Sequence, residues 1–171
     1  MTKEELLDYL TQLNNKMKLA DIKGELHIYG GAVMCLVLEA RQSTKDIDGW
    51  FVPTRDMREL IEEVANDNGI DKNWLNDGVK GFISSNDNTE SFLSLTNLEI
   101  STALPEYVFA MKCMAVRKDA DSKDIDDIKF LINYLGIKTY DEAIQIVLQY
   151  FPQNLISIRT QLTLEELFDI T

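Results

Sequence analysis

The stretch IYGGAVMCLVLEARQSTKDIDGWF, residues 28–51, predicts the fold most directly. Its first residues end a short strand over Glu25 to Tyr29. The diglycine at 30 and 31 interrupts that strand. An apolar run from Ala32 to Ala40 then indicates a buried helix. From Asp46 to Val52, polar and apolar residues alternate with the period of a second strand. The segment therefore predicts a strand, a Gly-Gly turn, a helix and a strand.

The second strand presents two carboxylates on one face. Asp46 and Asp48 are two residues apart, which places their Cα atoms about 7 Å apart on the same side of a strand. Such a pair suits a divalent ion like Mg²⁺, which takes one or two carboxylates together with phosphate oxygens. The alternative is a strand face exposed to water, with two aspartates of no special role. Trp50 shares this face, where an aromatic residue belongs more often to a core than to a base-stacking platform.

The diglycine and the segment before the second strand are candidate phosphate contacts. Gly30 and Gly31 lie between a strand and a helix, where backbone N–H groups can approach an anion. Arg41, Thr44 and Lys45 directly precede the aspartates and are positioned to contact the same phosphates. The alternatives are an ordinary turn for the diglycine and a helix C-terminal cap for Arg41. Taken together, the two groups of residues indicate a site for one phosphorylated ligand.

The rest of the chain predicts further strands and then only helices. Leu98 and Ile100 share one strand face, and Glu99 points to the other. Pro105 opens the helical part. We expect an amphipathic helix at the start, a helix over 55–68, a hairpin around short β-like runs at 79–83 and 92–95, and later helices at 106–118, 121–135, 140–150 and 164–170. This order predicts a single domain over residues 1–171, with an α/β part at 1–104 and a helical part at 105–171 packed on it.

A lone charge stands out in the first of the later helices. Lys112 is the only charged residue between Tyr107 and Val116, and burying its ammonium without a partner would be costly. It can reach water along its own stem, or it can meet a carboxylate or the phosphates of a ligand. Asp124 is a suitable carboxylate because it lies at the end of the buried stripe of the next helix. Alternatively, Asp124 interacts only with the helix dipole in that first turn.

The residues just quoted resemble the nucleotidyltransferase signature of the DNA polymerase β superfamily. That signature is a diglycine or Gly-Ser after a strand, a helix, and Asp-x-Asp on the next strand. The AbiEii-toxin-like branch of small bacterial nucleotidyltransferases is the nearest resemblance, because LPEYVFAMKCMAVRKDADSKDIDDIKFL at 104–131 is similar to that branch's later lysine and acidic pattern. In this comparison Lys112, Asp124 and Asp127 match the branch's positions. The resemblance implies an α+β fold, a nucleotidyltransferase-like small mixed sheet with flanking helices, followed by a helical C-terminal half.

The resemblance also implies an activity and its parts. The activity is transfer of a nucleoside monophosphate from a nucleoside triphosphate to an acceptor hydroxyl, with Mg²⁺ or Mn²⁺ held by Asp46 and Asp48. Glu99 is the candidate third carboxylate, with Asp124 as the alternative, and Lys112 balances charge. The acceptor would be an RNA or tRNA end or a protein, and an antitoxin partner in a toxin–antitoxin or phage-defence pair is implied.

Two other readings use the same residues. One is a catalytically inactive nucleotidyltransferase fold that serves as a binding or regulatory module. The other is metal-dependent phosphate hydrolysis, in which water takes the place of the acceptor.

Composition limits the partners. The formal net charge is −12 and hydrophobic residues make up 45%, so we expect a packed core and no broad basic surface for nucleic acid. Between residues 41 and 60, four basic residues balance four acidic ones, which leaves room for a metal-neutralised triphosphate. Cys35 and Cys113 lie in apolar runs and are expected to be buried free thiols. We expect no membrane span and a cytoplasmic location.

Overall fold

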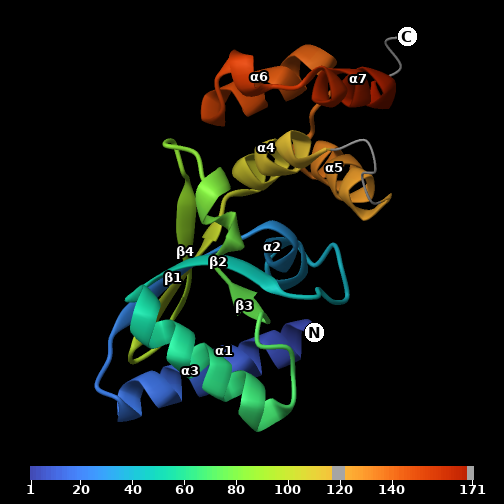
Figure 1. Cartoon of the computed structure of the whole chain (residues 1–171). Coiled ribbons are helices and arrows are strands. Elements are labelled where there is room, and N and C mark those ends of the chain that lie inside the picture. The colour runs from blue at the N-terminus through green and yellow to red at the C-terminus, as the bar shows by residue number, and fades with distance from the viewer. Residues whose placement is uncertain (117–121, 169–171) are drawn as a thin grey trace. The chain divides into compact units, whose positions relative to one another are not determined.

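The computed structural model describes residues 1–116 and 122–168. Over this part of the chain it has an α+β architecture with a five-stranded mixed sheet and seven α-helices, and 57% of the residues are helical (Figure 1). The chain forms two compact units. The first comprises residues 1–83 and 89–103, and the second comprises 84–88 and 104–171. The sheet lies in the first unit, and the residues from 104 onward belong to the helical second unit.

The sheet belongs to the first unit and has the strand order β3-β2-β1-β5-β4. Strand β1 is central, antiparallel to β2 and parallel to β5, whereas β4 and β5 form the antiparallel hairpin. A short β3 extends the sheet parallel to β2. The strands are β1 Gly24–Tyr29, β2 Ile47–Val52, β3 Leu75–Asn76, β4 Thr89–Ser94 and β5 Leu98–Ala103.

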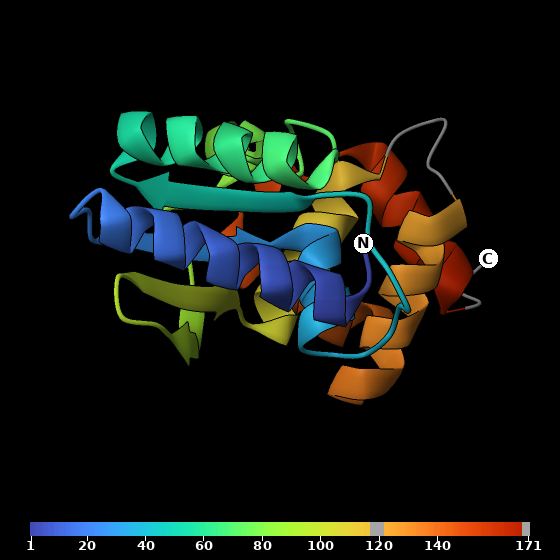
Figure 2. The ribbon, with the colours of Figure 1, turned by 90° about the horizontal axis from the view of Figure 1, so that it is seen from below.

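One face of the sheet is apolar and is covered by helices α1 (Lys3–Leu19) and α3 (Thr54–Asn68). A Cβ built on Gly24 of this face would meet Met17 of α1 at 2.9 Å and Met57 of α3 at 3.0 Å. Both methionines are fully buried. Figure 2 shows the two helices side by side along the sheet. The core of the first unit therefore lies between this face and the helix pair.

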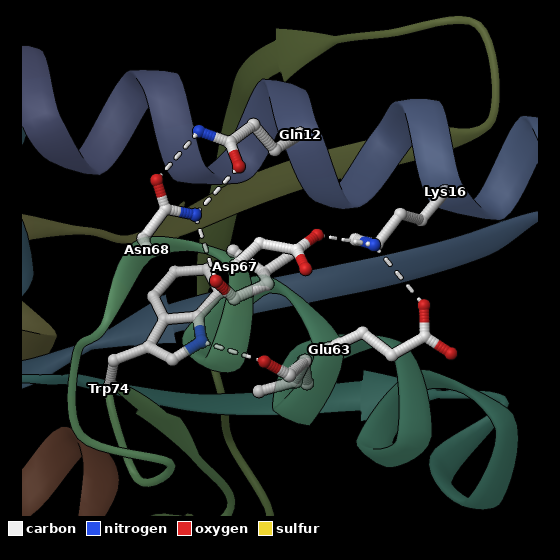
Figure 3. A network of polar contacts seen from close by, with 8 residues as sticks. Gln12, Lys16, Glu63, Asp67, Asn68 and Trp74 are labelled. Atoms are coloured by element: carbon white, nitrogen blue, oxygen red, sulfur yellow. Dashed lines mark hydrogen bonds and ion pairs between the residues drawn. The ribbon is translucent and has the colours of Figure 1, made fainter.

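Polar contacts join the two covering helices at their exposed edge (Figure 3). Lys16 Nζ pairs with Glu63 at 3.2 Å and with Asp67 at 2.8 Å. Beneath them, the buried Trp74 donates its indole N–H to the carbonyl oxygen of Ile61 and makes an edge contact with Tyr9. The loop around Trp74 therefore inserts a large ring into the core, which explains why this loop carries an aromatic residue.

The opposite face of the sheet carries a mixture of polar and aromatic side chains. Strand register puts the side chains of His27 and Trp50 opposite one another on this face, with Tyr29 opposite Asp48 in the next row. On β5 the same face carries Ser101, which is paired with His27. The alternation predicted for residues 46–52 is confirmed, because Ile47, Gly49 and Phe51 are buried and the residues between them are only partly so.

The second unit is helical. Its α-helices are α4 Pro105–Ala115, α5 Ser122–Leu135, α6 Tyr140–Tyr150 and α7 Ile158–Leu167. Tyr107 of α4 packs against Tyr150 of α6 with ring centroids 4.7 Å apart. The Tyr107 hydroxyl also accepts a hydrogen bond from the backbone N–H of Ser84. Thr160 of α7 donates to the Cys113 carbonyl oxygen, which ties the last helix to α4.

Several predicted elements differ from those observed. The predicted 79–83 strand is a 3₁₀-helix at Gly78–Phe82, and the last helix begins at Ile158 because Ser157 caps it. The helix predicted over 106–118 ends at Ala115, and residues 117–118 lie outside the described part. The end of the helix predicted at 164–170 also lies partly outside it. Cys35 and Cys113 are buried free thiols, as predicted.

Candidate functional site

The diglycine marks the start of helix α2 (Gly30–Leu36), directly after β1. Gly30 has a φ of 61°, in the left-handed region that glycine adopts without steric cost. A Cβ at this position would lie 3.3 Å from the Asp48 Oδ2 atom, so the carboxylate sits against the glycine. The register explains this contact, because Asp48 is paired with Tyr29, the last residue of β1. The structure therefore brings the diglycine and the second aspartate together.

Helix α2 is shorter than the predicted 32–40 segment. The chain reverses after it, with Glu39 in the left-handed region at a φ of 52° and the Ala40 N–H donating to the Met34 carbonyl oxygen. This hydrogen bond closes the turn, and the left-handed position in it is held by glutamate where glycine is the common residue. The Lys3 ammonium pairs with the Glu39 carboxylate at 2.6 Å. The reversal ends the helix early and returns the following residues toward its first turn.

The returning segment places two of the predicted phosphate contacts beside Gly31. A Cβ on Gly31 would lie 3.2 Å from Thr44 Oγ1 and 3.3 Å from Arg41 Nη1. Thr44 is buried, its hydroxyl donates to the Asp46 carbonyl oxygen, and its backbone N–H donates to the Met1 carbonyl oxygen. Because Gly31 has no side chain, the guanidinium and the hydroxyl approach its backbone closely.

Two further predicted residues lie at the start of β2. Asp46 directly precedes the strand and is partly exposed, and Lys45 beside it is exposed. Asp46 is two residues before Asp48, so the pair occupies the end of β2 nearest the diglycine. Gly30, Gly31, Arg41, Thr44, Asp46 and Asp48 together form what we call the diglycine site.

The donor set of the diglycine site fits a magnesium ion that is shared with a ligand. Among the described residues, no three His, Cys, Asp or Glu side chains are grouped so as to hold a metal ion. Mg²⁺ does not need such a cage, because it binds through one or two carboxylates and completes its octahedron with water and substrate phosphates. Asp46 and Asp48 supply the two carboxylates that such a shared Mg²⁺ needs. They are too few to form a structural metal site, in which protein side chains provide all the ligands.

Glu99 is not brought to the aspartates. It shares their face of the sheet, but it is paired with Glu25 at the beginning of β1, whereas Asp48 is paired with Tyr29 at its end. Four residues along a strand span about 13 Å. Glu99 instead accepts a hydrogen bond from Ser94 at 2.6 Å. The strand register therefore does not agree with the predicted role of Glu99 as third metal ligand. The prediction that Glu99 lies on the face opposite Leu98 and Ile100 is correct.

Lys112 and Asp124 meet each other in the second unit. Lys112 Nζ lies 2.7 Å from Asp124 Oδ1 and 2.9 Å from Asp127 Oδ2. The lysine and Asp127 side chains are only 13% and 4% exposed, so these contacts hold charge inside the helical unit. The expectation that the Lys112 ammonium meets a carboxylate is confirmed. The ion pairs join α4 to α5, which gives all three residues a structural role.

One residue that the sequence analysis did not assign to the site, His27, lies with the already noted Trp50 in the row next to Asp48. His27 stacks on Trp50 with ring centroids 5.1 Å apart and planes at 26°. Among the described residues, the His27 Nε2 atom is the one buried side-chain nitrogen or oxygen without a hydrogen-bond partner. The alternation along β1 places His27 on the same face as Glu25 and Tyr29, and this could have been seen in the sequence. The pairing of His27 with Trp50 could not, because it depends on the strand register.

No protein-family model, curated protein or solved structure matches the chain. Within residues 1–116 and 122–168, no helix has the length and apolar composition needed to cross a membrane.

Proposed function

We propose that this protein is a Mg²⁺-dependent nucleotidyltransferase of the DNA polymerase β type, acting at the diglycine site. The observation that carries the proposal is the contact of the Asp48 carboxylate with Gly30, at 3.3 Å from the position a Cβ would take. It joins a carboxylate pair suited to a metal with a backbone turn suited to phosphate. The alternative, a solvated strand face on which the two aspartates have no special role, would not require a contact between Asp48 and Gly30.

The residues beside Gly31 would bind the phosphates of the nucleotide. Arg41 supplies a fork of N–H donors that matches phosphate oxygens, and Thr44 supplies a hydroxyl. The bare backbone of Gly31 lets phosphate oxygens come close to both groups. The segment that carries them is held in place by the Thr44 backbone hydrogen bond to Met1. Holding this segment in place limits the conformational entropy that it loses when a ligand binds.

Asp46 and Asp48 would hold the metal ion. When bound, Mg²⁺ neutralises charge on the triphosphate and stabilises the charge that develops during displacement. In the reaction, the acceptor oxygen forms a bond to the α-phosphorus and the bond from that phosphorus to the bridging oxygen breaks. Pyrophosphate leaves with the bonding electron pair, and the acceptor proton passes to water. Arg41 is positioned to stay with the pyrophosphate group as it leaves.

A direct test combines nucleotide binding with label transfer. The protein is incubated with Mg²⁺, each α-labelled nucleoside triphosphate, and total RNA or cell extract. A variant carrying Asp46→Asn and Asp48→Asn is compared with Asp56→Asn, a carboxylate on α3 outside the site. We expect transfer by the wild type and by the control and loss of it in the double variant. No transfer to any acceptor together with no Mg²⁺-dependent nucleotide binding would overturn the proposal.

One observation favours a second candidate, the inactive binding module. Among the described residues no third acidic side chain joins the aspartates, and the superfamily signature often includes one. An inactive module would bind nucleotide with Mg²⁺ and transfer nothing. The same assay separates the two functions, because it measures binding and transfer in one experiment.

A further inference from the structure

The stacked pair of His27 and Trp50 lies on the face of the sheet opposite α1 and α3, in the row next to Asp48. Both side chains are only partly buried. Trp50 is two residues from Asp48 on β2, so their side chains point to the same face with Cα atoms about 7 Å apart. An aromatic surface this close to the proposed metal ligands is within reach of a molecule that reacts there.

The surroundings of the pair are polar, unlike those of a core aromatic cluster. The Thr89 hydroxyl lies 3.5 Å from His27 Nδ1, and Ser101 is paired with His27 on β5. His27 Nε2 has no hydrogen-bond partner in the described part of the chain, and Glu25 Oε2 stays 3.7 Å from it. We call His27, Trp50, Thr89 and Ser101 the stacking platform. It combines an aromatic ring with hydroxyl groups, as a polar planar ligand requires.

The chemistry of the proposed reaction indicates on which side of the aspartates the acceptor binds. In phosphoryl transfer the attacking and leaving oxygens lie roughly in line on opposite sides of the phosphorus. Arg41 and Thr44, assigned to the leaving pyrophosphate, lie on the Gly31 side of the aspartates. The acceptor must then approach from the other side. Along β2, the residue on that side and on the same face is Trp50.

We propose that the stacking platform is the acceptor subsite and that it binds a nucleoside end, with the base stacked on Trp50. This inference rests on the proposed function, which indicates the side from which the acceptor approaches the aspartates. Tryptophan presents a flat ring that stacks with any nucleobase. Ser101 and Thr89 offer hydrogen bonds to the base or sugar. The platform thereby selects acceptors that carry a planar ring, in preference to a protein side chain with only a hydroxyl.

The charges nearby limit how much of a nucleic acid can bind. Glu25 is 62% exposed beside the platform, and Glu99 is paired with it on β5. Two carboxylates at this end of the sheet repel a phosphate backbone passing over them. The acceptor is therefore engaged through its terminal nucleoside, with its remaining phosphates directed away from the sheet.

The chain contains its own reporter for this subsite. It has two tryptophans, and Trp74 is buried at 1% exposure in the core. In a Trp74→Phe variant, the tryptophan fluorescence comes from Trp50 alone. We titrate this variant with adenosine, guanosine, cytidine and uridine, and with ribose as the ring-free control. A Trp50→Phe variant, which keeps only Trp74, is the matched control for non-specific quenching. Circular dichroism verifies that both variants are folded.

We expect saturable quenching of Trp50 by at least one nucleoside, none by ribose, and none in the Trp50→Phe control. In the transfer assay, Trp50→Ala is expected to raise the acceptor KM about tenfold or more with kcat little changed, and Trp50→Phe to restore most of the loss. Quenching without transfer would reject the proposed activity and leave a nucleoside site. Transfer with an unchanged acceptor KM in Trp50→Ala, or no saturable quenching by any nucleoside, would overturn the subsite.

Discussion

The Asp48 carboxylate lies against Gly30, with its Oδ2 atom 3.3 Å from the position that a Cβ on this glycine would occupy. The contact joins the end of one strand to the beginning of its antiparallel neighbour. It requires glycine for two reasons, the left-handed φ of 61° and the absence of a side chain.

Replacing Gly30 by alanine should damage the site more than the fold. The left-handed conformation alone costs a residue with a Cβ about 1–2 kcal/mol, and the new methyl group also displaces Asp48. Gly69→Ala is the matched control, because Gly69 has a φ of 64° and open space around it. Urea denaturation and Mg²⁺-dependent nucleotide binding are measured for both. Equal losses of stability, with nucleotide binding retained in both, would contradict this reading of the contact.

Glu99→Gln should leave nucleotide transfer within about twofold of the wild type, since the register places Glu99 about 13 Å along the strand from Asp48. Its hydrogen bond from Ser94 can be kept by the amide oxygen. Initial rates of label transfer, compared with Asp48→Asn, test this directly. A loss in Glu99→Gln as large as that in Asp48→Asn would mean that Glu99 acts in the site after all.

Lys112→Met should strongly destabilise the protein. The substitution removes the partner of the Asp127 carboxylate, which is only 4% exposed, and a buried charge left alone costs about 3–5 kcal/mol. Lys129→Met, an exposed position on α5, is expected to change the unfolding free energy by less than about 0.5 kcal/mol. Adding Asp127→Leu to Lys112→Met should recover part of the loss, because the orphaned charge is removed. Urea denaturation of the four proteins measures each change.

Stability should fall at alkaline pH through Cys113. Burial raises the pKa of this thiol, so it stays protonated in the folded protein while the unfolded chain ionises above about pH 8.5. The stabilising contribution is complete below that pH and is lost as the pH rises. By about pH 10 the loss reaches about 2 kcal/mol. A Cys113→Ala variant should show a shallower decline in unfolding free energy than the wild type, and an identical slope would refute the assignment.

Local patterns predicted much of this fold. The alternation at residues 46–52 correctly assigned Phe51 to the core and Asp48 to the opposite face, because side-chain direction has a period of two. The diglycine correctly marked the boundary between β1 and α2. The pairing of Lys112 with a carboxylate also followed from local composition, since a buried ammonium requires an anion.

Register and chain reversal could not be predicted in the same way. Alternation assigned Glu99 to the right face but says nothing of its position along that face, and pairing with Glu25 places it at the far end. The early end of α2 depends on Glu39 adopting a left-handed conformation that sequence propensity disfavours. The stacking of His27 on Trp50 likewise depends on which residues of two strands are paired.

The fate of the phosphates of a labelled nucleoside triphosphate tests the central claim most directly. The protein is supplied with Mg²⁺, acceptor RNA, and triphosphate labelled either on the α- or on the γ-phosphate. We predict that each α-label joined to the acceptor is matched by one γ-label released as pyrophosphate, and that Asp48→Asn abolishes both. Release of orthophosphate without labelled acceptor would contradict the account and indicate a phosphate hydrolase.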